Sequence, residues 1–166
     1  VGRAYGRTCL IGRAIPSKVT KQNAGQATGR RVTVEISMRV CIFLIIDGLK
    51  LEAQACLLLP SLRRHLGDTV SVIAYRRKDV TTPLQPVTEQ VLRACNVKLR
   101  EIPGTGPDDP NPWREPYPIG NKILAASDRR DCDISVFINT DMVFTGPFDF
   151  AKVLGSAKIA AVVSDY

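Results

Sequence analysis

The chain has 166 residues, 45% of them hydrophobic, which suits a single α/β domain with a core of its own. The formal charge of +7 is unevenly spread: residues 1–37 (the leader) carry seven basic residues and one acidic residue, whereas residues 38–166 carry 16 and 15. The basic excess therefore belongs to the leader. Because the leader has almost no aromatic residues between its charges, we do not expect a nucleic-acid partner.

The cysteines and the apolar stretches bear on the cellular setting. The five cysteines are widely spaced, with no C-x-x-C pair and no histidine nearby, so neither a disulfide framework nor a zinc site is expected. No segment reaches the roughly 20 apolar residues that span a membrane. We therefore expect a reduced, cytoplasmic protein without a membrane span.

The leader differs in character from the rest of the chain. Residues 1–37 are rich in Gly, Arg, Thr, Ser and Gln and show no sustained periodicity, which predicts disorder. Two interpretations remain open: a natural disordered tail, or non-native upstream sequence with Met38 as the true start. On either interpretation the domain covers residues 38–166.

The first half of the domain alternates strand and helix. Val40–Ile46 is a β-branched apolar run typical of a strand buried on both faces, and Asp47-Gly48 ends it. Leu51–Leu66 has helical spacing, although Pro60 is expected to kink or divide this helix. Val70–Tyr75 predicts a second strand.

The same alternation continues to the end of the chain. Before a proline-rich loop at residues 103–118, the pattern gives a second helix and a third strand. After the loop it gives a helix, a strand, a short helix and a strand. The expected elements are Pro86–Cys95, Val97–Ile102, Ile119–Ser127, Ile134–Ile138, Phe148–Leu154 and Lys158–Val163. This order predicts an α/β fold, a Rossmann-like and mainly parallel sheet with helices on both faces. Ligands of such sheets bind where the strands end.

The end of one expected strand carries the most informative polar residues. Ile134–Ile138 leads directly into Asn139-Thr-Asp141. In extended chain, side chains two residues apart point to the same side, so Asn139 and Asp141 are expected to face the ligand crevice together. Oxygen ligands at this position can hold a divalent cation that bridges a diphosphate. The alternative is an Asx turn that only begins the next element.

The segment from Val136 to Phe144, followed by Gly146-Pro-Phe-Asp149, resembles the D-x-D region of GT-A-type glycosyltransferases. In that family the second Asp binds Mn²⁺ or Mg²⁺ and, through the metal, the phosphates of a nucleoside diphosphate sugar. Asp141 occupies that position. Asn139 stands where the family has its first Asp; it keeps an oxygen but loses the charge, so metal binding is expected to rest mainly on Asp141.

Three further segments carry the same resemblance. Val40–Ile46 with Asp47-Gly48 is similar to the first strand of the family, whose end meets the nucleoside. Tyr117–Ala126 is similar to the helix that carries a basic residue towards the diphosphate, and Lys122 lies in its first turn. Lys158–Asp165 is similar to the strand after the D-x-D motif. The resemblance covers residues 38–166.

The resemblance implies transfer of a sugar from a nucleoside diphosphate sugar to an unknown acceptor. The implied nucleotide-sugar site is Asp47, Gly48, Lys122, Asn139 and Asp141, with Asp141 and Asn139 as metal ligands for Mn²⁺ or Mg²⁺. It also implies that the chain is a glycosyltransferase fragment, truncated at its C-terminus before the acceptor-binding half and inactive alone. No general base is assigned.

Two other functions share this fold class. A sugar-phosphate nucleotidyltransferase needs a Gly-rich, basic loop after the first strand, and Asp47-Gly-Leu-Lys50 is a poor match. A non-enzymatic α/β nucleotide-binding domain would bind nucleotide without regard to metal. Among single residues, Arg76-Arg77-Lys78 is interpreted as a solvated loop, and His65 as a helix-terminal residue rather than a base.

Overall fold

The fold is a six-stranded sheet with helices on both faces. The computed structural model describes residues 10–13, 38–104, 118–157 and 159–161. The strand order is β4-β3-β2-β5-β1-β6. The strands are β1 (Leu10–Arg13), β2 (Val40–Ile45), β3 (Val70–Arg77), β4 (Val97–Ile102), β5 (Ile134–Phe137) and β6 (Ile159–Ala161), and the helices are α1 (Leu49–Leu66), α2 (Pro86–Ala94), α3 (Pro118–Ser127) and α4 (Phe150–Leu154).

Four strands form the parallel part of the sheet, with β2 at its centre. β2 pairs in parallel with β3 and with β5, and β3 pairs in parallel with β4. The carboxyl ends of these four strands therefore meet at one edge. This confirms the predicted α/β, Rossmann-like architecture.

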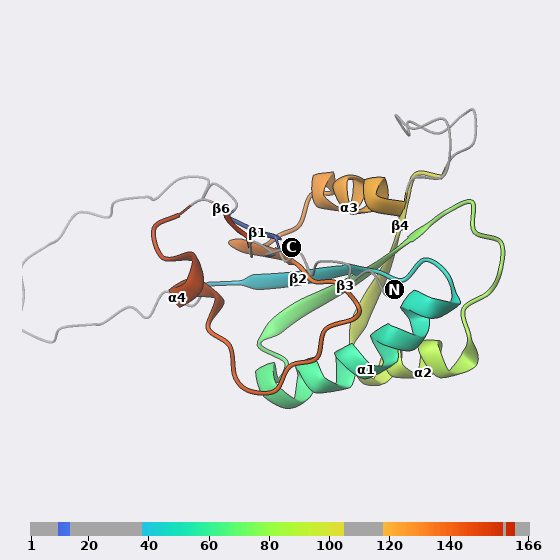
Figure 1. Ribbon diagram of the computed structural model, residues 1–166, viewed down its shortest axis with the longest axis horizontal. Helices are drawn as coiled ribbons and strands as arrows, with labels where there is room; N and C mark the ends of the chain where they lie inside the picture. Colours follow the sequence, from blue (N-terminus) through green and yellow to red (C-terminus); the bar gives the residue numbers. More distant parts are fainter. Residues whose placement is uncertain (1–9, 14–37, 105–117, 158, 162–166) are drawn as a thin grey trace, which may run out of the picture.

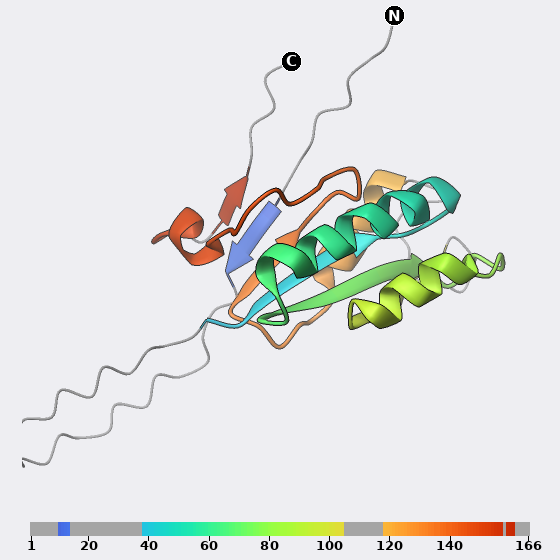
Figure 2. The same cartoon turned by 90° about the horizontal axis from the view of Figure 1, so that it is seen from below.

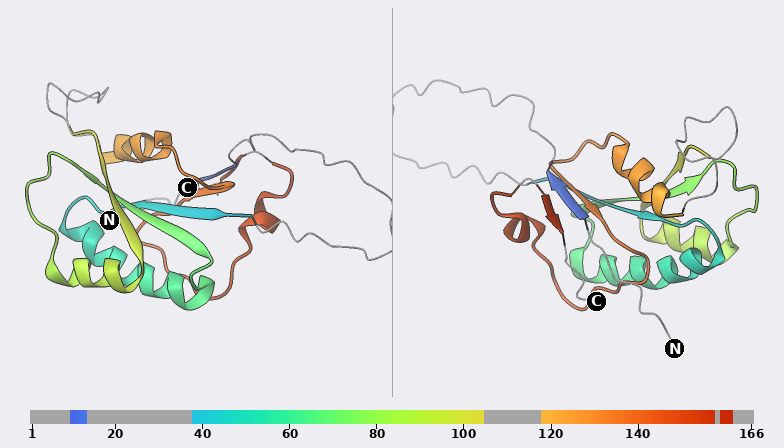
Figure 3. Two further views of the ribbon diagram at one scale, coloured as in Figure 1. Left: turned by 180° about the vertical axis from the view of Figure 1, so that it is seen from behind. Right: turned by 45° about the horizontal axis from the view of Figure 1, so that its top comes forward.

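The side chains of β2 alternate between two apolar cores. Ile42 and Leu44 join the larger core beneath α1, whereas Cys41 and Phe43 join a smaller core beneath α3. A strand that is buried on both faces must be apolar at successive positions, which explains its unbroken hydrophobic run. Figures 1 and 3 show α1 and α2 together on one face of the sheet and α3 on the opposite face.

Helix α1 runs unbroken from Leu49 to Leu66, with Pro60 inside it. Pro60 therefore does not divide the helix in two, which was one of the two expected outcomes. Leu58, Leu59 and Leu62 are almost completely buried around the proline. Packing of this apolar face against the sheet offsets the hydrogen bond that a proline cannot donate. Figure 2 shows α1 running along β2 with α2 beside it.

The leader is not without structure throughout, which departs from the expectation of disorder. Leu10–Arg13 forms β1, which pairs antiparallel with β5 on one side and with β6 on the other. A strand edge offers unpaired N–H and C=O groups, and β1 satisfies them along β5. The prediction of disorder used the amino-acid composition of all 37 leader residues, and an average over that length does not reveal a strand of four residues. The rest of the leader lies outside the described residues.

The last two described elements are α4 and β6, and α4 is shorter than the sequence predicts. Helix α4 begins at Phe150, after Asp149, whose carboxylate accepts a hydrogen bond from the backbone N–H of Lys152 at 2.9 Å. β6 joins the sheet through the antiparallel β1 rather than beside the parallel strands. The sheet is thus parallel in its first four strands and antiparallel at the β1–β6 edge.

Candidate functional site

Two consecutive residues near the N-terminus of α3 connect the predicted site. Asn121 Nδ2 donates to Asp47 Oδ2 at 3.2 Å, and Lys122 Nζ donates to Asn139 Oδ1 at 3.0 Å. Asp47 follows β2 and Asn139 follows β5, so both lie at the carboxyl edge of the parallel strands. The N-terminal part of α3 therefore brings together three of the predicted residues and adds Asn121, which the sequence did not single out.

Asp47 is held from a second direction by a basic residue at the end of β3. Arg77 Nε donates to Asp47 Oδ2 at 2.7 Å, and both side chains are largely buried, with 18% and 13% of their surfaces exposed. The sequence interpretation of Arg76-Arg77-Lys78 as a solvated loop is wrong for Arg77. The signal available in the sequence was the position of this arginine directly after the apolar run of the second expected strand.

Gly48 forms the turn between Asp47 and α1. Its φ of 95° lies in the region that side chains disfavour, and it is the N-cap residue of the helix. The Gly48 carbonyl accepts the first helical hydrogen bond, from the N–H of Glu52 at 3.1 Å. Gly48 thus allows the chain to leave the sheet sharply at Asp47.

The Asn139-Thr140-Asp141 segment presents its outer two residues and buries the middle one. Thr140 is 5% exposed, and its hydroxyl donates to Gln54 Oε1 of α1 at 2.8 Å. Asn139 is half-buried against Lys122, whereas Asp141 is exposed. The buried threonine fixes the segment to α1 and leaves Asp141 accessible.

Metal-binding capacity at this edge rests on few atoms. No group of three or more His, Cys, Asp or Glu residues suited to a metal occurs among the residues the structure describes. Asp141 supplies one exposed carboxylate, and the Asn139 oxygen already accepts a hydrogen bond from Lys122. Mg²⁺ commonly uses one or two carboxylates together with substrate phosphates and water, so a single carboxylate is compatible with such an ion.

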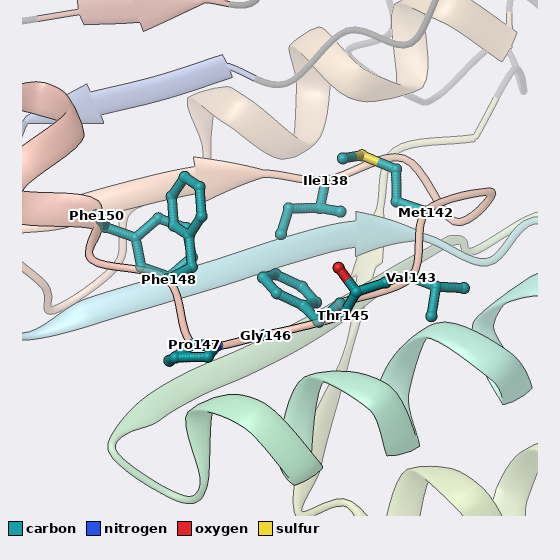
Figure 4. Close-up of a pocket in the computed structure, with 9 residues that line it drawn as sticks. Ile138, Met142, Val143, Thr145, Gly146, Pro147, Phe148 and Phe150 are labelled. Atoms are coloured by element: carbon teal, nitrogen blue, oxygen red, sulfur yellow. The ribbon is translucent and has the colours of Figure 1, made fainter.

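An apolar cavity of about 300 Å³ lies beside this segment, on the α1 side of the sheet. Figure 4 shows the chain from Met142 to Phe150 passing along it, opposite Ile138. Phe144 is fixed there because its backbone N–H donates to the Ser61 hydroxyl of α1 at 3.0 Å. The remaining lining residues are Val143, Thr145, Gly146, Pro147 and Phe148.

A polar cluster fixes the far end of α3. Asp128 Oδ2 accepts hydrogen bonds from the Tyr75 hydroxyl at 2.5 Å and from Arg100 Nη1 at 2.6 Å. Arg130 donates to the Tyr75 oxygen at 3.1 Å, and its guanidinium lies 4.1 Å from the centre of the Phe43 ring. Burial, reinforced by the bond to Asp128, raises the pKa of Tyr75. Burial opposes ionisation of Asp128, but the bonds from Tyr75 and Arg100 outweigh it and lower the pKa of that carboxyl.

Other predicted residues take no part in this arrangement. His65 lies in the last turn of α1, the helix-terminal position that the sequence predicts. The proline-rich segment at 105–117 and residues 162–166 lie outside the described residues. None of the helices in the described part of the chain is both long enough and apolar enough to cross a membrane.

Comparison with known proteins identifies the family. The family model of the Rhodobacterales glycosyltransferase domain matches residues 42–165, which is most of the chain and includes every residue of the site. No curated protein matches the chain. The chain belongs to the Rhodobacterales glycosyltransferase domain family and is an enzyme of the glycosyltransferase type.

Proposed function

We propose that this glycosyltransferase takes its sugar from a nucleoside diphosphate donor that lies across the N-terminal part of α3. The observation that carries the proposal is the pair of hydrogen bonds from Asn121 and Lys122 to Asp47 and Asn139. In this arrangement Asp47 and Gly48 meet the nucleoside, and Lys122, Asn139 and Asp141 meet the diphosphate. The resemblance to GT-A-type enzymes supports the same division.

Lys122 is the proposed anchor for the diphosphate. It is the fifth residue of α3, near the end of the helix whose partial positive charge also favours an anion. Asn139 accepts a hydrogen bond from Lys122 without carrying a charge. A carboxylate at position 139 would neutralise the lysine, so the asparagine leaves the full positive charge for the phosphates.

A divalent cation, Mn²⁺ or Mg²⁺, is the proposed cofactor, with Asp141 as its carboxylate ligand. The Asn139 amide oxygen has two lone pairs, and the one not used by Lys122 makes it the second proposed ligand. When bound, such an ion neutralises negative charge on the departing diphosphate.

The proposed reaction breaks the bond between the anomeric carbon of the sugar and the diphosphate oxygen. A nucleophilic atom of the acceptor forms the new bond to that carbon and releases its proton to the solution, and the nucleoside diphosphate leaves with the electron pair. Lys122 and the N-terminus of α3 stabilise the charge that grows on the leaving group. The acceptor is not assigned.

The cytoplasmic setting expected from the cysteines remains a prediction. Cys41, Cys56, Cys95 and Cys132 are free thiols.

Binding measurements on Lys122→Met test this proposal. We expect the variant to bind its preferred nucleoside diphosphate, chosen from UDP, GDP, ADP and CDP, about tenfold more weakly, because a charged hydrogen-bond donor is lost. Lys152→Met, which removes an exposed lysine of α4, is the matched control and should bind as the wild type does. Absence of nucleoside diphosphate binding by the wild-type chain would refute the proposal.

A further inference from the structure

The carboxylate of Asp47 is held by two donors that converge on one of its oxygens. Arg77 Nε and Asn121 Nδ2 both donate to Oδ2, at 2.7 and 3.2 Å. Asn121 is itself 5% exposed. Within the described part of the chain, the other oxygen, Oδ1, has no hydrogen-bond partner. A carboxylate oxygen accepts hydrogen bonds, so Oδ1 is suited to a ligand that donates one.

Arg77 is fixed in turn by its surroundings. Its Nη1 lies 3.6 Å from Asp79 Oδ2, so the guanidinium sits between two carboxylates. Asp79 lies so close to the backbone of Gly104 that a Cβ at position 104 would come within 2.5 Å of Asp79 Cγ. Gly104 therefore leaves the room that Asp79 occupies.

These contacts join four separate segments at the carboxyl edge of the sheet. Asp47 follows β2, Arg77 ends β3 and Asp79 lies just after it, Gly104 follows β4, and Asn121 belongs to α3. The N–H of Lys78 also donates to the carbonyl of Ile102 at 3.0 Å, which ties the end of β3 to the end of β4. Largely buried ionic contacts of this kind fix side-chain orientation, since a partner left unpaired would be costly.

We infer that Arg77 and Asn121 are positioning residues that orient Asp47 so that Oδ1 accepts a hydrogen bond from the nucleoside part of the donor. A ribose hydroxyl or a base N–H is the chemistry that Oδ1 recognises. This inference rests on the proposed function, because it assumes a nucleoside diphosphate donor. Arg77 and Asn121 act through Asp47 and do not touch the donor themselves.

Calorimetry with the preferred nucleoside diphosphate and with inorganic pyrophosphate tests the inference. Arg77→Met and Asn121→Ala should each weaken nucleoside diphosphate binding about tenfold while leaving pyrophosphate binding unchanged. A merely structural role would weaken both ligands alike. Arg93→Met removes an exposed arginine that pairs with Glu89 within α2, and it should change neither affinity.

A double-mutant cycle isolates the route through Asp47. Asp47→Asn should weaken nucleoside diphosphate binding, and adding Asn121→Ala or Arg77→Met to it should weaken binding little further, because all three changes disrupt the same contact. Asn121→Ala carries the test if the arginine variant does not fold. Additive losses, or equal losses for both ligands, would overturn the inference while leaving the proposed function intact. A wild-type chain that binds pyrophosphate but no nucleoside diphosphate would overturn both.

Discussion

At the scale of single residues, the two charged groups of the site differ in their partners. Asp47 is paired with Arg77, whose guanidinium also lies 3.6 Å from Asp79. Lys122 is bonded to the neutral Asn139, so its positive charge is not balanced there. In the proposed site, the Asp47 carboxylate is therefore ion-paired, and the Lys122 ammonium is available to an anion.

Asn139→Asp tests the balance at the diphosphate end. The new carboxylate adds a negative ligand for a divalent cation but also pairs with Lys122. We expect nucleoside diphosphate affinity in the presence of Mn²⁺ to stay equal or rise, and affinity without metal to fall, because Lys122 is then neutralised. Titration of the variant with and without Mn²⁺ measures both. A gain in metal-free affinity would contradict the role given to Lys122.

At the scale of elements, α3 is anchored at both ends. Its N-terminal part makes the contacts of the site, and its last turn is held by the cluster of Tyr75, Asp128 and Arg130. Arg130 also donates to the carbonyls of Ala125 and Ala126 near the end of the helix, at 2.5 and 3.0 Å. The contacts at both ends therefore fix the position of α3 on the sheet.

The cluster at the end of α3 predicts a dependence of stability on pH. Because folding lowers the pKa of Asp128, its contribution is present above the ordinary carboxyl pKa and is lost as the pH falls through the folded value. Asp128→Asn should cost about 1 kcal/mol of unfolding free energy at neutral pH, given its partial exposure. The difference from wild type should shrink below about pH 4.

Urea unfolding at a series of pH values measures this effect. Asp68→Asn is a suitable control because Asp68 is 84% exposed and its contact with Arg63 is long, at 3.7 Å. It should leave stability almost unchanged at every pH. A difference between Asp128→Asn and wild type that is constant from neutral to acidic pH would contradict the ionised role of Asp128.

At the scale of the whole molecule, β1 connects β6 to the rest of the sheet. β5 pairs with β1 and not with β6, so residues near the start of the chain join segments near its end. The two ends of the described fold are therefore linked through a single short strand.

Removal of β1 should destabilise the sheet. A chain that lacks residues 1–37 exposes the edge of β5 and leaves β6 without its partner, so we expect the thermal midpoint to fall by about 5 °C or more and self-association to rise. A chain that lacks only residues 1–8 keeps β1 and is the matched control. Scanning calorimetry and light scattering compare the two. Equal midpoints and equal masses per particle would show that β1 does not contribute to stability.

The main elements followed from local patterns, whereas the contacts between them did not. The apolar run of β2 and the spacing of α1 are readable in single segments, so their positions were predicted to within two residues. The pairing of Arg77 with Asp47 joins residues 30 apart, and that of Thr140 with Gln54 joins residues 86 apart. Such contacts depend on the order of strands in the sheet, which hydrophobic periodicity does not specify. β1 was missed for the same reason, because its stability comes from β5 and not from its own composition.

The proposed binding of the donor diphosphate through a metal at Asp141 is tested most directly by calorimetry of the Asp141→Ala variant. Nucleoside diphosphate is titrated into wild type and variant, each with and without Mn²⁺. We predict that Mn²⁺ strengthens binding by wild type and has almost no effect on the variant, because the only proposed carboxylate ligand is gone. Asp149→Ala, which changes the cap of α4 instead, should keep the full metal effect. Equal strengthening of binding by Mn²⁺ in wild type and Asp141→Ala would contradict the account.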